Sequence, residues 1–580
     1  MPDPSVPLAP REFPRTFVPK GLTIGNWMDC EPLLQELGAR PLPDARALER
    51  FLADFGELND ILDEEGTLRY IRMTCRTDDP EIGTEYRRFL EKVVEPSTTR
   101  SFSLLKHYLS CPARPSLPRE TYRVFDRDAA NQVEIFREEN VPLGTQEQAL
   151  SQEYQGIAGA MTILFDGEER TLQQMGRYLE LSDRLRREEA WRAIQDRRLR
   201  DRERLDNLYD SMRHLRTRIS DNAGFADYRS YAFRLRGRFD YGIADCETFH
   251  TAIERCVVPL VRRLQARRAD RLGLPALRPW DMQNDPRGLS ALAPFRTTGE
   301  LADKVHGILG KVDPLFGDVF GRMRDLKLLD LDSRKGKAPG GYNTSLAEAR
   351  LPFIFMNAAG LDSDVRTLFH ESGHAVHAFL SRDQPLSFYR HEPIEFAEVA
   401  SMGMELLCEP HLGDFYADPK EAARSSLKHF EDILTLLPWI AQVDAFQHWV
   451  YTNPNQLKEE RKRVWQTLTG RFGGDVDWNG LEEIQGYQWQ KQLHLFEHPF
   501  YYIEYGIAQL GALQLWVNAR KNRERALERY KRGLSLGGSL TLPALFDAAG
   551  LRFDFSEGIL TGLMADAGDE IERLENLLDA

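Results

Sequence analysis

The stretch DSDVRTLFHESGHAVHAFL, residues 362–380, decides what fold to expect of this chain. It opens on Asp-Ser, a pair typical of helix N-termini, and apolar residues then recur every three to four positions. A helix is therefore predicted. His370 and His374 stand four residues apart, so their imidazoles project from one face, one turn apart. Glu371 is rotated by about 100° and lies beside that pair.

These three residues form the H-E-x-x-H pattern of zinc sites. The neutral imidazoles of His370 and His374 would hold Zn²⁺, and the Glu371 carboxylate would take a proton from a water molecule at the metal. With 13 histidines in 580 residues, a chance match has a probability of roughly a few percent. His377, one turn further, is predicted to pack or to support a ligand rather than to bind the metal.

A second predicted helix, residues 393–406, offers the third ligand that zinc needs. It carries Glu395, Glu398 and Glu405 at spacings of three and seven. One of these carboxylates can bind the ion while another orients a ligand histidine. Spacing alone does not choose among the three.

Residues 489–506, WQKQLHLFEHPFYYIEYG, place two histidines and three tyrosines within twelve residues. Imidazole and phenol groups can donate hydrogen bonds to the oxyanion of a tetrahedral intermediate. The same composition is also typical of an aromatic-rich core helix whose hydroxyls are merely satisfied. Taken alone, these residues favour the core helix.

Composition limits the class of protein. The chain has 76 Lys and Arg against 90 Asp and Glu, a net charge of −14, which argues against a general binder of nucleic acid or of anionic membranes. Its apolar stretches are far shorter than the ~20 residues of a membrane-spanning helix. The six cysteines are scattered and the N-terminus has no apolar signal segment, so a cytoplasmic protein without disulfides is expected.

Along the chain, three parts are predicted: an extended arm (1–25), an N-terminal helical domain (26–170) and a catalytic domain (171–580) that contains the zinc site (362–410) and the segment 489–506. The boundary near residue 170 rests on an Asp-Gly turn between short strand candidates.

Two further strand candidates are residues 342–346 and 351–357. Pro352 favours an edge position for the second, and an edge strand can pair with an extended peptide. A small structural hairpin is about as good an interpretation of the same residues.

Together these segments resemble the thimet oligopeptidase family of zinc metallopeptidases, in its oligoendopeptidase F branch. The resemblance is carried by the helix from His370 to His377, by FAEVAS (396–401) and by residues 494–505. The loop at Gly340-Gly341-Tyr342, the strand 352–357 and SDNAGF (220–225) add to it. It covers the chain from about residue 160 to the C-terminus, whereas the first 150 residues resemble the family only in being helical.

The resemblance implies a mainly α fold of the zincin type (gluzincin class), with two helical lobes around a deep channel and a small β-sheet beside the zinc helix. It implies one Zn²⁺ per chain and hydrolysis of internal bonds in short unstructured peptides. The implied metal ligands are His370, His374 and Glu398, with Glu371 as general base and Glu405 and His377 as supporting residues.

The same resemblance implies transition-state donors from residues 494–505. Tyr505 and Tyr502 are the favoured phenols, and His494 is the favoured imidazole. His498 stands where some family members carry a tyrosine, so His498 and Tyr501 stay open as alternatives. Peptide contacts are expected from Gly340, Gly341, Tyr342, Phe353, Phe355 and Tyr501.

Two rival functions remain at this stage. A zinc carboxypeptidase of similar helical fold would need a cationic group to hold the free carboxylate of its substrate. A non-catalytic helical peptide-binding protein would have no need of Glu371 as a base. Short peptides are the expected partners, with no nucleic acid and no membrane, and a monomer is favoured.

Overall fold

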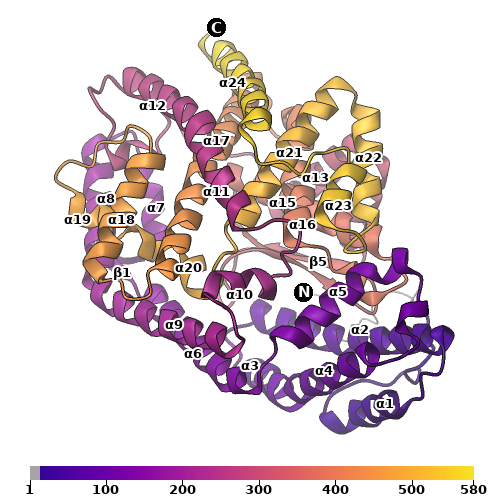
Figure 1. Cartoon of the computed structure of the whole chain (residues 1–580). Coiled ribbons are helices and arrows are strands. Elements are labelled where there is room, and N and C mark those ends of the chain that lie inside the picture. The colour runs from indigo at the N-terminus through magenta and orange to yellow at the C-terminus, as the bar shows by residue number, and fades with distance from the viewer. Residues whose placement is uncertain (1–12) are drawn as a thin grey trace. The chain divides into compact units, whose positions relative to one another are not determined.

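The computed structural model describes residues 13–580; the first twelve residues of the predicted arm lie outside the described residues. Residues 13–25 form no helix or strand. The rest of the chain is mainly helical (Figure 1). It divides into two compact units, each assembled from three separate segments: residues 1–134, 293–422 and 511–553 form unit 1, and residues 135–292, 423–510 and 554–580 form unit 2.

Unit 1 contains a helical layer from the N-terminal segment and a three-stranded sheet with its covering helices. Its elements are α1 (Trp27–Ala39), α2 (Ala45–Cys75), α3 (Pro80–Phe89), α4 (Glu95–Leu109), α5 (Arg119–Ile135), α13 (Thr298–Val312), α14 (Pro314–Asp325), β3 (Leu329–Asp332), β4 (Tyr342–Leu346), β5 (Leu351–Ala358), α15 (Asp362–Ser381), α16 (Ile394–Cys408), α22 (Arg523–Ser535) and α23 (Leu542–Ala548). An apolar cluster that includes Leu48, Phe51 and Phe55 forms the core of the N-terminal helices.

The sheet of unit 1 corrects one prediction. Its strand order is β3-β5-β4, so β5 is the central strand and not an edge. β5 pairs in parallel with β3 and antiparallel with β4. Pro352 is tolerated there because β3 is short: its pairing with β5 begins at Ile354, whose N–H donates to Leu328. The missing N–H of Pro352 therefore falls beyond the end of β3.

Helices α15 and α16 pack against each other in unit 1, and α15 also packs on β5 (Figure 1). The Asp364 carboxylate accepts the N–H groups of Ala359 and Leu361 and so caps the start of α15. The two helices approach closely at Gly373. A Cβ atom there would lie 2.5 Å from the Ala400 carbonyl oxygen and 2.6 Å from Ser401 Cα, so only glycine permits this crossing.

Unit 2 is helical except for one hairpin. Its elements are α6 (Val141–Gly159), β1 (Thr162–Phe165), β2 (Glu168–Thr171), α7 (Leu172–Leu179), α8 (Arg184–Arg200), α9 (Arg202–Asn222), α10 (Tyr228–Leu235), α11 (Ile243–Ala252), α12 (Val258–Leu272), α18 (Lys458–Phe472), α19 (Glu482–Gly486), α20 (Leu493–Glu497) and α24 (Glu557–Asp579). The predicted hairpin turn is confirmed, with Asp166 and Gly167 at φ of 52° and 77°. The long helices α17 (Pro419–Thr452) and α21 (Ile503–Lys521) begin in one unit and end in the other.

The predicted division of the chain at residue 170 does not coincide with these units. A boundary drawn along the sequence separates consecutive segments, whereas packing joins residues 1–134 with residues 293–422 and 511–553.

Among the described residues, no helix is both long and apolar enough to cross a membrane. All six cysteines are free, and five of them are buried.

Candidate active site

The predicted metal ligands converge in unit 1. His370 and His374 lie on α15 and Glu398 lies on α16, with one ligand atom from each within 4.8 Å of the others. Glu398 Oε2 is 3.3 Å from His370 Nε2 and 3.8 Å from His374 Nε2. Glu395 does not belong to this group. Of the three carboxylates that spacing left open, the structure therefore groups Glu398 with both histidines.

Neighbouring side chains hold this group in place. His370 Nδ1 lies 2.7 Å from Glu405 Oε1, and because a carboxylate only accepts, Nδ1 carries the proton. In the neutral ring, Nε2 of His370 would then keep its lone pair, on the side where Glu398 Oε2 lies 3.3 Å away. The Ser401 hydroxyl donates to Glu398 Oε2 at 2.9 Å. Glu405 thus lies where the resemblance places a supporting carboxylate.

Two imidazole nitrogens and one carboxylate are the protein ligands of many catalytic zinc sites. The side chains are half-buried histidines and a buried glutamate, so a metal here would be reachable from one side. The chemistry of the donors therefore fits zinc.

Glu371 and His377 differ in their surroundings. Burial raises the pKa of Glu371 to about 7, and the carboxylates of Glu398 and Glu405 oppose its ionisation further. A divalent cation at the histidines would favour the ionised form again. His377 is fully buried, its ring packs edge-to-face on Phe396, and its Nδ1 atom lies 3.5 Å from Glu392 Oε1.

The predicted transition-state donors lie in unit 2: His494 is on α20, Tyr505 is on α21, and His498, Tyr501 and Tyr502 lie in the turn between these helices. His494 is the centre of this aromatic group, with ring centroids 4.9 Å from Tyr502, 5.7 Å from Tyr501 and 6.0 Å from Tyr505. His498 is exposed, and its ring contacts the rings of His494 and Tyr501. The geometry thus favours His494 over His498.

A chain of hydrogen bonds fixes the proton on His494. The Trp439 indole N–H, which can only donate, points to Gln492 Oε1 at 3.0 Å. The Gln492 amide group therefore turns its N–H₂ toward His494 Nδ1, 2.7 Å away. Nδ1 must accept, so the hydrogen of the neutral imidazole sits on Nε2. Burial lowers the pKa of His494 to about 4, helped by His498 and Arg236, and keeps the ring neutral.

The turn between α20 and α21 is held in an uncommon conformation. Phe500 is buried and has φ of 62°, a region that bulky residues rarely occupy. Its N–H donates to Gln447 Oε1, its carbonyl accepts from Arg238, and the Pro499 carbonyl accepts from Arg236. These bonds fix the positions of the tyrosines that follow.

The predicted peptide-contacting residues fall into two groups. Gly340 and Gly341 are exposed, and Tyr342 is half-buried, with its ring stacked on Phe355 and its hydroxyl bonded to Thr74. Phe353 and Phe355 are 1% and 0% exposed, so their assignment as peptide contacts is wrong. The reason is that β5 is buried along almost its whole length, with α15 packed on the sheet.

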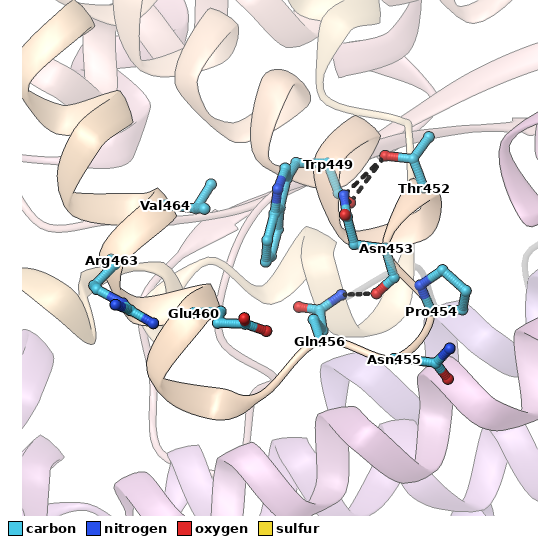
Figure 2. A pocket seen from close by; sticks show the side chains of 9 residues that line it. All are labelled: Trp449, Thr452, Asn453, Pro454, Asn455, Gln456, Glu460, Arg463 and Val464. Carbon is cyan, nitrogen blue, oxygen red and sulfur yellow. Dashed lines mark hydrogen bonds between the residues drawn. The ribbon is translucent and has the colours of Figure 1, made fainter.

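Two cavities of unit 2 differ in whether predicted site residues line them. One, of about 530 Å³, is lined by the end of α17 and by α18, with Trp449, Asn453, Glu460 and Arg463 among its residues, but by none of the predicted site residues (Figure 2). Its amides bond to nearby groups: Asn453 to Trp449, and Gln456 to Asn453. A smaller cavity, of about 260 Å³, includes His498 and Arg236.

Comparison with known proteins identifies the family of this chain. The model of peptidase family M3 matches residues 177–565, which include both histidine-bearing segments. This chain belongs to peptidase family M3. The matched range also agrees with the extent of the resemblance predicted from the motifs.

Relatives within family M3 include the oligoendopeptidase F branch. The chain is 24% identical over 223 residues to an oligoendopeptidase F homolog of Borreliella burgdorferi (36% of each chain), and 26% identical over 255 residues to oligopeptidase PepF of Bacillus subtilis (42% of this chain, 37% of PepF). The matches thus span little more than a third of these relatives.

Comparison of whole structures covers a larger share of the chain than these sequence matches do. A structure of PZ peptidase A with an inhibitor superposes with a TM-score of 0.87 at 27% identity, covering 96% of this chain and 99% of that one. The N-terminal helices, which the motifs did not identify, therefore belong to the shared fold.

Sequence reasoning did not identify Gln492 and Trp439. Gln492 lies two residues before His494, a spacing at which a side chain can reach a neighbouring ring. Trp439 is distant in sequence, and only the packing of α17 brings it to Gln492.

Proposed function

We propose that this chain is a zinc-dependent endopeptidase that hydrolyses internal peptide bonds of short, unstructured oligopeptides. The observation that carries the proposal is the convergence of His370, His374 and Glu398 beside Glu371 in a chain of family M3. A protein that only binds peptides would have no use for Glu371, a carboxylate placed next to a metal group but outside it.

One zinc ion per chain would be held by His370, His374 and Glu398. When bound, zinc polarises the scissile carbonyl and makes water a stronger acid. Glu371 accepts the proton of the attacking water and passes it to the leaving amine. Glu405 keeps His370 in the tautomer that presents Nε2.

In this proposal His494 and Tyr505 donate hydrogen bonds to the oxyanion, with Tyr502 supporting His494. The support for His494 is its neutral ring with the hydrogen on Nε2, which leaves a donor of fixed direction. Preorganised donors of this kind contribute about 2.7–4 kcal/mol each to transition-state stabilisation. His498, exposed and outside the centre of the group, is assigned no part in the chemistry.

For substrate binding, β4 replaces the strand predicted from sequence. β4 is an edge of the sheet and lies next to α15, since Asn343 Nδ2 is 3.5 Å from the Glu371 carbonyl oxygen. An extended peptide can add to such an edge through backbone hydrogen bonds. Backbone recognition favours unstructured peptides of mixed sequence. A cytoplasmic enzyme without nucleic-acid or membrane partners remains the prediction from sequence, with a monomer favoured.

The test is mass spectrometry of a mixed digest of short peptides, with zinc content measured on the same sample. Internal cleavage of many sequences at one equivalent or more of zinc supports the proposal. Stepwise loss of single C-terminal residues would instead assign the carboxypeptidase alternative. No cleavage by the zinc-loaded protein would leave the peptide-binding alternative.

A further inference from the structure

A second group of metal-binding residue types lies in unit 2, apart from the residues assigned to catalysis. Cys246 and His250 stand four apart on α11, and Asp444 and His448 stand four apart on α17. Each helix thus presents two such side chains on one face, the same spacing that H-E-x-x-H uses. Ligand atoms of Cys246, Asp444 and His448 lie within 4.8 Å of one another, and all three residues are buried.

Several polar atoms at this place have no hydrogen-bond partner. Neither ring nitrogen of His448 forms a hydrogen bond, although its side chain is only 8% exposed. Asp444 is 0% exposed and its Oδ1 atom is also unsatisfied. Only the other carboxylate oxygen is bonded: it accepts from His250 Nε2 at 2.8 Å, while His448 Nε2 lies 3.3 Å away from it.

Buried polar atoms without a hydrogen bond destabilise the folded state. Their convergence therefore needs an explanation. A cation that takes a lone pair from each of Cys246, Asp444 and His448 would satisfy them together.

The surroundings of the group permit a cation. The rings of Phe233 and Phe500 pack around His448. Arg238 is a positive side chain that acts on Cys246, and its guanidinium is paired with the Glu504 carboxylate at 2.7 Å. The Asp444 carboxylate brings one negative charge, and a Cys246 thiolate would bring a second, which balances a divalent ion.

We propose that Cys246, Asp444 and His448 bind a divalent metal ion of the zinc class, separate from the catalytic metal. Thiolate, imidazole and carboxylate are the zinc ligands found in proteins, and bond lengths of about 2.0–2.3 Å require only a small contraction of the group. Binding releases the thiol proton of Cys246 to solvent. His250 orients the Asp444 carboxylate. The ion would be structural, because it would join α11 to α17 in a buried site without access for a peptide.

Cobalt substitution tests this directly, because the two sites differ in sulfur. The catalytic group consists of nitrogen and oxygen donors, so only the second site gives the near-ultraviolet charge-transfer band of a thiolate bound to Co²⁺. Metal-free full-length protein is titrated with Co²⁺ alone, and bound metal is counted by elemental analysis. Two equivalents and a thiolate band are expected.

Cys246→Ser should remove the band and reduce the count from two to one, and His448→Gln should do the same. Cys30→Ser is the matched control, because Cys30 is equally buried but lies in unit 1. It should keep both equivalents and the band. In His370→Ala the band should persist with one equivalent, so that a failure of the catalytic assignment is separated from a failure of this one. One equivalent without a band in the wild-type protein would overturn the proposal, as would a band that survives Cys246→Ser.

Discussion

Glu371 is the residue on which the proposed chemistry depends. Glu371→Gln keeps the size and burial of the side chain but cannot accept a proton from water. We expect kcat to fall about 10²–10⁴-fold, the contribution usual for a general base, with zinc still bound. Single-turnover cleavage of a peptide, with metal content determined on the same preparation, measures both. A variant that retained more than about a tenth of the wild-type rate would show that Glu371 is not the base.

Gln492 acts on His494 without touching the substrate, so its test needs a pH profile. Wild-type His494, with a pKa of about 4, stays a neutral Nε2–H donor at higher pH. In Gln492→Glu the carboxylate can only accept. It therefore draws the proton to Nδ1 and raises the pKa of His494 above about 6.5, its ordinary value.

The variant should then be active while His494 is protonated and lose about 10²–10³-fold in kcat as the pH rises through the raised pKa. The wild-type enzyme should show no such loss. Gln490→Glu is the matched control, since it adds the same charge two residues earlier, at an amide bonded to the Arg202 carbonyl. Parallel pH profiles for wild type and Gln492→Glu would disprove the positioning role.

At the scale of elements, the crossing of α15 and α16 determines whether the metal group forms. Gly373→Ala would place a Cβ atom against the Ala400 carbonyl and force the helices apart. We expect the free energy of unfolding to fall by about 1–3 kcal/mol, as for other overpacked sites. Zinc affinity should fall with it, because Glu398 moves away from the histidines. Urea unfolding and zinc titration measure the two effects.

Gly307→Ala provides the control for that change. Gly307 also lies inside a helix, α13, but nothing lies within 4 Å of the Cβ atom that would be added. Alanine there should leave zinc binding unchanged and raise stability by about 0.5–1 kcal/mol. If both substitutions behaved alike, the close crossing at Gly373 would not be what holds the site together.

For the sheet of unit 1, the sequence predicts the strands but not their order. The strands were predicted from their composition, and Pro352 correctly indicated a missing ladder bond. Composition does not show that the pairing of β3 begins only at Ile354, past Pro352, so it predicts an edge position for β5, which is central. The error carried over to Phe353 and Phe355, whose rings are buried in the core.

For the molecule as a whole, local periodicity predicts which side chains share a face of one helix. The histidine pair on α15 and the carboxylates of α16 follow from spacing, whereas their convergence depends on how two helices cross. The grouping of residues 1–134 with residues 293–422 depends on packing between distant segments, and no local pattern encodes it. The Cys246–His250 and Asp444–His448 pairs are i, i+4 spacings, but the sequence does not show that α11 and α17 bring His250 to Asp444.

The most direct test of the whole account is the cleavage of a short peptide blocked at both ends, measured before chelation, after chelation and after zinc is returned. An endopeptidase needs neither charged terminus. The account predicts internal cleavage by the native protein, loss of cleavage with the metal and recovery when zinc is restored, while long denatured casein is left largely intact. A blocked peptide that stays whole while its unblocked form loses C-terminal residues would contradict the account, and so would cleavage that chelation leaves unchanged.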